Sequence, residues 1–276
     1  MSILSTRPAG AADPLVAALG SAGHRVHAVP TVELKHVEPG GSLDLAVAGL
    51  TGYDWIIATS AAGAVAVLAA MDRAVGPGKV VARKPLWAAV GRATAVVLEE
   101  AGVRVDVVPE VSRGVAITQA LLSATGSLAD RRVLLPRSDR ADGVLPDALR
   151  AAGATVDDVV AYRTVEGPPA SVRVLLDALS DGELQAIVLC SGSAVRGLLA
   201  LAASGDGTGA TQVHSRIAAT PLVSIGPSTS AAIREAGLQV AAEAARPSVD
   251  DLVVAVNRMT VGHRPPTTRT PQEVVS

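Results

Sequence analysis

The sequences AVGRATAVVLEEAGVRV, residues 89–105, and SIGPSTSAAIREAGLQV, residues 224–240, follow one pattern. Each has a short apolar strand, a glycine, an Ala-rich helical segment carrying a threonine near its start, and a second glycine where the helix should end. A strand that leads directly into a helix is the repeating unit of an α/β fold. The pattern therefore predicts parallel sheet covered by helices, and it occurs twice.

Three further pairs of segments repeat in the same order, at an offset of about 130 to 135 residues. ILSTRPAG (3–10) pairs with VLLPRSDR (133–140), SAGHRVHAVPTVEL (21–34) pairs with AAGATVDDVVAYRTV (151–165), and WIIATSAAGAV (55–65) pairs with AIVLCSGSAVR (186–196). We predict an internal duplication with five strands in each half. The strands are expected near 2–5, 25–29, 54–58, 86–90, 103–107, 131–135, 156–161, 185–189, 221–225 and 238–241.

Polar segments containing Pro and Gly follow the second strand of each half: ELKHVEPGG at 33–41 and RTVEGPP at 163–169. Such segments are typical of domain crossovers. Two crossovers give domain one as 1–34 plus 166–260 and domain two as 36–163. Two consecutive halves split near residue 130 are the alternative, and the residue pattern alone does not choose. Residues 261–276 are predicted to form a disordered tail.

Composition excludes several classes of function. The net charge is −2 and the chain has two Trp, two Tyr and no Phe, so we expect no nucleic-acid partner. A single cysteine, Cys190, and five histidines without ligand spacing predict no disulfide, no metal site and a thiol that packs as a small apolar group. The N-terminus lacks a long apolar run, so we expect a cytoplasmic protein without membrane contact. No feature of the sequence requires an oligomer, so we expect a monomer.

Serines and threonines lie at the junctions where a strand ends and a helix begins. They are Ser60, Thr94, Ser191, Ser193, Ser228 and Thr229. In a doubly wound sheet these junctions line the carboxyl edge, where ligands bind, and helix N-termini there attract anions. We predict a site for a ligand with several carboxylates or phosphates; simple helix capping is the other interpretation of each residue. Arg7 and Arg137 occupy matched positions after first strands and are candidate carboxylate ligands.

Tyr162 ends an apolar strand at the second linker, a position that fits either a half-buried strand end or a role in a site. The chain has no G-x-x-x-x-G-K-[ST], no G-x-G-x-x-G and no G-x-S-x-G motif, so a nucleotide enzyme and a serine hydrolase are unsupported.

Taken together, the sequence resembles the uroporphyrinogen-III synthase family over about 1–258. The resemblance rests on ILSTRPAGAADPLVAALGSAGHRVHAVPTVEL, YDWIIATSAAGAV, AAVGRATAVVLEEAGV, LLPRSDRADGVLPDALRAAGATVDDVVAYRTV, IVLCSGSAVRGLL and SIGPSTSAAIREAGL. It implies two α/β domains with doubly wound sheets, joined by a two-stranded linker and with a cleft between them. It therefore favours the discontinuous domain assignment.

The resemblance also implies a reaction: cyclisation of hydroxymethylbilane, a linear tetrapyrrole, to uroporphyrinogen III with loss of water and inversion of ring D, without cofactor or metal. Tyr162 matches the family's candidate for protonating or positioning the leaving hydroxyl. Ala58 and Leu189 stand where the family often has Phe, and Ala62 where it often has Asn or Arg, which puts fine substrate contacts in question.

Two other classes of protein compete with an enzyme. One is a non-catalytic module of the same fold that senses a polycarboxylate. The other is a periplasmic type of sugar-binding protein, against which the missing signal sequence argues.

Overall fold

The computed structural model describes residues 1–7, 13–75, 85–110, 114–204 and 207–261. The chain divides into two compact units. Unit 1 contains Met1–Glu33 and the chain from Val165 onward, and unit 2 contains Leu34–Thr164. The predicted tail from 261 lies, apart from its first residue, outside the described residues.

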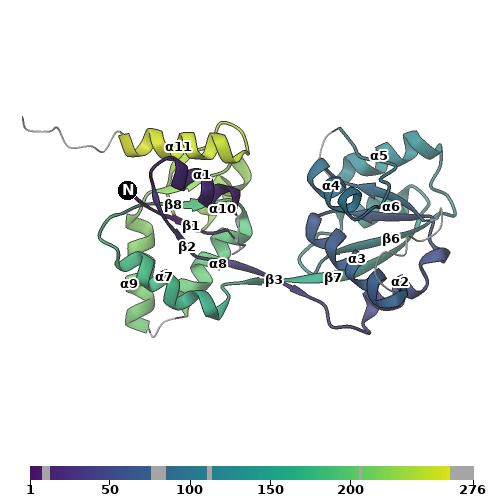
Figure 1. The fold of residues 1–276 in the computed structure, drawn as a ribbon, viewed down its shortest axis with the longest axis horizontal. Helices are drawn as coiled ribbons and strands as arrows, with labels where there is room; N and C mark the ends of the chain where they lie inside the picture. The colour runs from purple at the N-terminus through teal and green to yellow at the C-terminus, as the bar shows by residue number, and fades with distance from the viewer. Residues whose placement is uncertain (8–12, 76–84, 111–113, 205–206, 262–276) are drawn as a thin grey trace, which may run out of the picture. The chain divides into compact units, whose positions relative to one another are not determined.

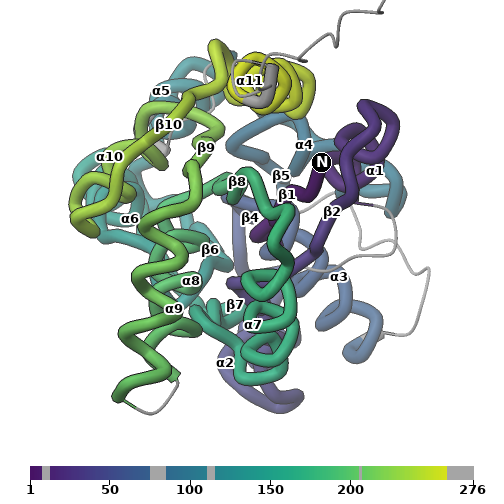
Figure 2. The backbone as a smooth tube through the Cα atoms, turned by 90° about the vertical axis from the view of Figure 1, so that its left-hand side faces the viewer, coloured from purple at the N-terminus to yellow at the C-terminus, as the bar shows by residue number. Residues whose placement is uncertain are grey.

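Unit 1 is built on a parallel sheet whose strands come from both ends of the chain. The sheet order is β10-β9-β8-β1-β2, which Figure 2 shows from β10 to β2. The strands are β1 (Ser2–Ser5), β2 (Arg25–Ala28), β8 (Leu184–Leu189), β9 (Leu222–Ser224) and β10 (Val240–Glu243). The predicted strands near 2–5, 25–29, 185–189, 221–225 and 238–241 are confirmed within three residues.

Helices cover both faces of this sheet (Figure 1). Ile3 packs against α1 (Pro14–Ser21) and α11 (Val249–Val261), which lie side by side. The next residue, Leu4, packs on the opposite face against α7 (Val172–Ser180), α8 (Gly192–Ala203), α9 (Gly207–Ala219) and α10 (Pro227–Glu235). Successive strand side chains point to opposite faces, so a continuously apolar strand requires helices on both.

Unit 2 is also built on a five-stranded sheet, with the order β3-β7-β6-β4-β5. Its strands are β3 (Val32–His36), β4 (Trp55–Ala58), β5 (Leu86–Ala89), β6 (Arg132–Ser138) and β7 (Thr155–Glu166). Its strand β3 lies at the edge beside β7, whereas in unit 1 β10 lies at the edge beside β9. Ile56 packs under α2 (Ser42–Ala48), α3 (Ala61–Val75) and α4 (Arg92–Glu100), whereas Ile57 packs under α5 (Gly114–Thr125) and α6 (Val144–Ala151). Two short 3-10 turns, Leu50–Gly52 and Pro169–Ser171, complete the described elements.

Three strand predictions need correction. Residues 103–107 form no strand; Val107 makes only an isolated bridge with Ala88. The reason is local, because the Asp106 carboxylate accepts the Trp87 N–H at 3.0 Å and so occupies a donor that a continuous ladder would need. Residues 32–36, expected partly as linker, form β3 and take the fifth place in the sheet beside β7. Strand β7 continues to Glu166, five residues beyond its predicted end.

The chain passes from unit 1 to unit 2 inside β3 and returns inside β7. Beyond β7, Gly167 has φ +72° and its N–H donates to the Thr31 carbonyl at 2.9 Å.

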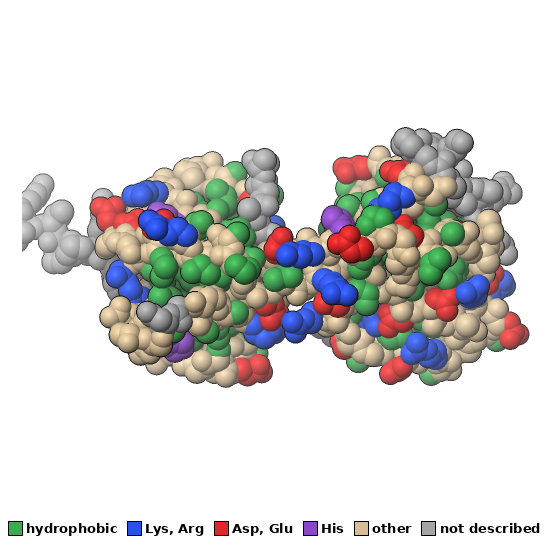
Figure 3. All heavy atoms as spheres, turned by 90° about the horizontal axis from the view of Figure 1, so that it is seen from below, with side chains coloured by type: hydrophobic (Ala, Val, Ile, Leu, Met, Phe, Trp, Pro, Cys, Tyr) green, Lys and Arg blue, Asp and Glu red, His purple; other side chains and the backbone are tan. Residues whose placement is uncertain are grey.

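Among the described residues, no helix is both long and apolar enough to cross a membrane. Figure 3 shows basic and acidic side chains interspersed on the face that it draws.

Candidate active site

The carboxyl edge of the unit 2 sheet brings Tyr162 and Ser60 together. Tyr162 lies within β7, opposite Ser138 at the end of β6, rather than at the end of its strand. It is half-buried, and its hydroxyl oxygen is 3.0 Å from the Ser60 Oγ. Ser60 follows β4 and accepts the N–H of Gly63, in the first turn of α3, at 3.1 Å. The structure therefore links the predicted tyrosine to a predicted junction serine and, through that serine, to a helix N-terminus.

Two further polar residues lie on the same edge, and the sequence reasoning missed them. The Ser138 Oγ, at the end of β6, is 3.0 Å from the Thr164 Oγ1, two residues after Tyr162. The Asp139 N–H donates to the Tyr162 carbonyl at 3.1 Å, and the Asp139 carboxylate accepts the Thr164 N–H at 2.9 Å. The only sequence signal was their position: Ser138 follows Arg137, and Thr164 lies two residues after Tyr162, both of which were predicted site residues.

Thr94 lies in the first turn of α4, after the neighbouring strand β5, and is 6% exposed. Its N–H donates to the carbonyl of Gly91, the N-cap residue. Because β4 and β5 are adjacent, Thr94 shares the carboxyl edge with Ser60, but no hydrogen bond joins the two side chains in the described structure. The burial of Thr94 favours a packing and capping contribution alongside any contact with a ligand.

The carboxyl edge of unit 1 carries the corresponding residues. Ser191 caps α8 by accepting the Ala194 N–H at 3.1 Å, and its Oγ is 2.9 Å from that of Ser193. In the first turn of α10, Ser228 is exposed whereas Thr229 is 1% exposed. Strands β8 and β9 are neighbours, so these helix N-termini lie on one edge.

Both candidate arginines already have partners. Arg7 forms an ion pair with Asp13, the N-cap residue of α1, at 2.6 Å. Arg137 is 7% exposed, binds the Asp158 carboxylate through Nε at 2.9 Å and Nη2 at 2.5 Å, and donates to the Asp142 carbonyl at 2.5 Å. A buried bidentate guanidinium of this kind favours a structural role for Arg137.

Neither Tyr53 nor Cys190 competes with Tyr162 as a proton donor. The second tyrosine, Tyr53, lies at the opposite edge of the sheet, where burial and a 2.6 Å hydrogen bond to Asp157 raise its pKa to about 12. Burial also raises the pKa of the Cys190 thiol, so it stays protonated near neutral pH. Among the described residues, no cluster of three His, Cys, Asp or Glu side chains is arranged to hold a metal ion.

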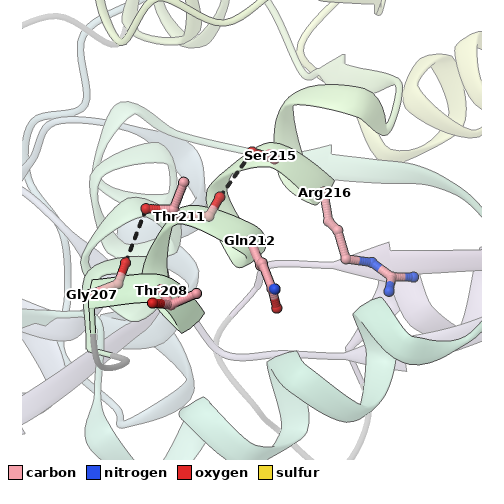
Figure 4. Close-up of a pocket in the computed structure, with 6 residues that line it drawn as sticks. All are labelled: Gly207, Thr208, Thr211, Gln212, Ser215 and Arg216. Atoms are coloured by element: carbon pink, nitrogen blue, oxygen red, sulfur yellow. Dashed lines mark hydrogen bonds between the residues drawn. The ribbon is translucent and has the colours of Figure 1, made fainter.

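A surface hollow in unit 1 (Figure 4) is lined by none of the junction residues described above. Residues of α9 line it: Gly207, Thr208, Thr211, Gln212, Ser215 and Arg216. The Thr211 and Ser215 hydroxyls donate to carbonyls of their own helix at 3.0 and 2.9 Å. Hydroxyls satisfied in this way do not indicate a ligand site.

The family model described as uroporphyrinogen-III synthase HemD matches residues 13–254. The chain belongs to the uroporphyrinogen-III synthase family. It is 31% identical over 259 residues to the uroporphyrinogen-III synthase of Synechococcus elongatus, covering 93% of this chain and 94% of that protein. The predicted family membership and the interpretation as an enzyme are confirmed, and the non-catalytic alternative gains no support.

Solved structures of the family share the fold. A mutant uroporphyrinogen III synthase of Thermus thermophilus superposes with a TM-score of 0.60 at 18% identity, covering 95% of this chain and 99% of that one. The Helicobacter pylori uroporphyrinogen-III synthetase gives 0.61 at 15% identity, covering 94% and 99%. At these identities the likeness concerns the fold alone, and it agrees with the predicted α/β class with parallel sheets.

Proposed function

We propose that this protein cyclises hydroxymethylbilane to uroporphyrinogen III, with loss of water and inversion of ring D, and that Tyr162 is the proton donor. The observation that carries the assignment of Tyr162 is its hydroxyl, half-buried at a sheet edge and 3.0 Å from the Ser60 Oγ. Parallel sheets bind ligands at this edge. The matched region, residues 13–254, includes Tyr162 and the junctions of both units.

The reaction begins at the hydroxymethyl group of ring A. The Tyr162 O–H transfers its proton to the hydroxyl oxygen while the C–O bond breaks, and the bonding pair leaves with water. Ring D attacks the resulting azafulvene cation through its substituted carbon, giving a spiro intermediate that breaks and recloses with ring D inverted. The product then loses one proton, which restores the phenol. No cofactor or metal enters this sequence.

Hydrogen-bond donors at the carboxyl edge of each unit are proposed to bind the eight substrate carboxylates. The helices α3, α4, α8 and α10 begin there, and each helix start offers unpaired backbone N–H groups and a partial positive charge. Ser60, Thr94, Ser191, Ser193, Ser228 and Thr229 occupy these helix starts. Arg7 also follows a strand at this edge, but its guanidinium is paired with the Asp13 carboxylate. Arg137 contributes by holding β6 and β7, since its donors go to Asp158 and the Asp142 carbonyl.

We also propose that units 1 and 2 are the two domains expected at 1–34 plus 166–260 and at 36–163, that they arose by duplication, and that β3 and β7 are their linker. The order β9-β8-β1-β2 in unit 1 parallels β5-β4-β6-β7 in unit 2. Gly23 and Gly153, paired by the repeat, have φ of +84° and +94° after their helices. Both α4 and α10 begin after a glycine N-cap.

A coupled assay tests the proposed reaction. Hydroxymethylbilane is generated in situ by its upstream deaminase, the products are oxidised, and isomers I and III are separated by chromatography. Without an enzyme the linear substrate closes to isomer I, so an excess of isomer III is the expected result. Isomer I alone from a folded sample would overturn the proposal.

The Tyr162→Phe variant tests the proton donor. Loss of the phenolic proton should lower turnover by about 100-fold, within the range of general acid catalysis. Tyr53→Phe is the matched control, because Tyr53 lies at the opposite edge of the same sheet and should leave turnover unchanged. Wild-type turnover in Tyr162→Phe would exclude Tyr162 as the essential acid.

A further inference from the structure

A β-bulge sets the direction of the Tyr162 side chain. Along β6 and β7, Arg137 pairs with Val160 but Ser138 pairs with Tyr162, so Ala161 is an extra residue on β7. In a regular strand two successive side chains point to opposite faces. Here Ala161 and Tyr162 both pack against the core under α2, α3 and α4. Bulges re-aim side chains next to functional sites, and this one turns the phenol towards the start of α3.

The start of α3 is shaped to receive the phenol. The Ser60 Oγ accepts the Gly63 N–H at 3.1 Å and lies 3.0 Å from the Tyr162 hydroxyl oxygen. Gly63 is buried, and a Cβ at this position would lie 3.1 Å from the Pro136 carbonyl oxygen and 3.3 Å from the Ser60 Oγ. The glycine therefore allows the first turn of α3 to approach the end of β6 without displacing Ser60.

Either hydroxyl can donate in the Ser60–Tyr162 hydrogen bond, and the proposed role of Tyr162 as the acid selects the direction. Ser60 has one hydroxyl hydrogen, and the Gly63 N–H occupies one of its two acceptor positions. A phenol that gives its proton to a substrate cannot also direct that proton at Ser60. A backbone N–H at a helix N-terminus polarises the serine and strengthens it as a donor.

We propose that Ser60 is a positioning residue that donates its hydroxyl hydrogen to the Tyr162 oxygen, so that the Tyr162 proton points away from α3 and towards the substrate. This role rests on the proposed function, in which Tyr162 is the acid, and it replaces a direct carboxylate contact for Ser60. As the phenol loses its proton, the Ser60 O–H stabilises the negative charge that develops on the oxygen.

The matched position in unit 1 carries the same cap without a tyrosine. Ser191 caps its helix in the same way, accepting the Ala194 N–H at 3.1 Å, but its hydroxyl partner is Ser193 at 2.9 Å. In unit 2 the residue corresponding to Ser193 is Ala62. Ser60 and Ser191 thus share the cap and differ in the tyrosine, so capping alone does not require a tyrosine partner.

The test is a double-mutant cycle in the coupled assay. Ser60→Ala is made in the wild-type and Tyr162→Phe proteins, with Ser60→Thr as the conservative variant. Ser248→Ala is the cap control, because Ser248 accepts the Asp251 N–H at 3.2 Å at the start of α11 and lies outside the proposed binding residues. We expect Ser60→Ala to lower kcat at least about tenfold with KM changed less than about threefold, because the acid loses its orientation. Ser60→Thr should recover most of kcat. Ser60→Ala should cause no further loss when Tyr162 is already Phe.

The possible results separate the two proposals. Absence of isomer III from the wild-type protein would remove the proposed function itself. Full turnover in Tyr162→Phe would remove the acid and, with it, the role of Ser60. If Ser60→Ala raises KM without lowering kcat, or lowers kcat equally in both backgrounds, Ser60 acts on the substrate directly and the inference is wrong. Near-UV circular dichroism shows that unit 2 is folded in the Ser60 and Tyr162 variants, since every Trp and Tyr lies in unit 2, and far-UV circular dichroism checks the helices of unit 1 in Ser248→Ala.

Discussion

Gly197 is predicted to be the glycine of unit 1 that least tolerates a side chain. It lies in the middle of α8, and a Cβ there would overlap the Thr31 carbonyl oxygen, 2.8 Å from the Thr31 carbonyl carbon and 3.2 Å from the Gly167 nitrogen. All of these neighbours are backbone atoms, which cannot swing aside. Gly197→Ala must therefore push α8 away from Thr31 by about 1.5 Å to restore van der Waals contact.

The cost has two parts. Overpacking a buried site costs about 1–3 kcal/mol. The shift also strains the 2.9 Å hydrogen bond from the Gly167 N–H to the Thr31 carbonyl, worth about 1 kcal/mol. We expect a loss of about 3 kcal/mol in the free energy of unfolding of unit 1. At roughly 2–4 °C per kcal/mol, Tm falls by about 6–12 °C.

The assay uses the uneven distribution of aromatic residues. Trp55 and Trp87 both lie in unit 2, so tryptophan fluorescence follows that unit, whereas far-UV circular dichroism follows the helices of both. Gly197→Ala should lower the dichroism transition of unit 1 and leave the fluorescence transition in place. Gly20→Ala is the control: Gly20 lies in α1 with no heavy atom within 4 Å of the added Cβ, so alanine should be neutral or slightly stabilising. The steric argument would be refuted if the dichroism transition of Gly197→Ala fell within roughly 1 °C of that of Gly20→Ala.

Two other predictions concern stability. The Asp181 carboxylate accepts hydrogen bonds from the Glu183 N–H, His27 and Ser2, which lower its pKa to about 2. A lowered pKa stabilises the fold above the unfolded value of about 4, and this contribution is lost as pH falls towards 2. The urea midpoint should therefore drop more between pH 5 and about pH 2.5 in the wild type than in Asp181→Asn, and equal drops would contradict this. Separately, Arg137→Gln should cost about 2 kcal/mol in urea unfolding, because it leaves Asp158 and the Asp142 carbonyl without their guanidinium; an unchanged midpoint would show that Arg137 is not structural.

Much of the fold followed from local sequence. The runs at 55–58 and 185–189 are apolar at nearly every position, which a sheet covered on both faces explains, and both form central strands. Gly102 and Gly237 were expected to end helices, and both have positive φ there. These features depend on side-chain type and backbone freedom within one short stretch of chain, so they can be read from the sequence.

The strand errors arose where pairing decided the outcome. The apolar alternation at 103–107 is typical of a strand, yet the Asp106 carboxylate takes the Trp87 N–H and the ladder stops at one bridge. Residues 32–36 resemble a polar linker because the side chains of β3 are largely exposed, but they pair with β7 as its neighbour in the sheet. A hydrogen-bonding partner far along the chain leaves no trace in local composition.

The sequence by itself determined the family, the α/β class and the choice of Tyr162 and Ser60 as candidates, because residue types and their spacing carry that information. Only the tertiary structure decided that their hydroxyls meet. That meeting depends on one extra residue, Ala161, in the pairing of β7 with β6, and on the absence of a side chain at Gly63 beside Pro136. Tertiary contacts likewise gave Arg137 its partner Asp158, because a guanidinium binds whichever carboxylate the fold places against it.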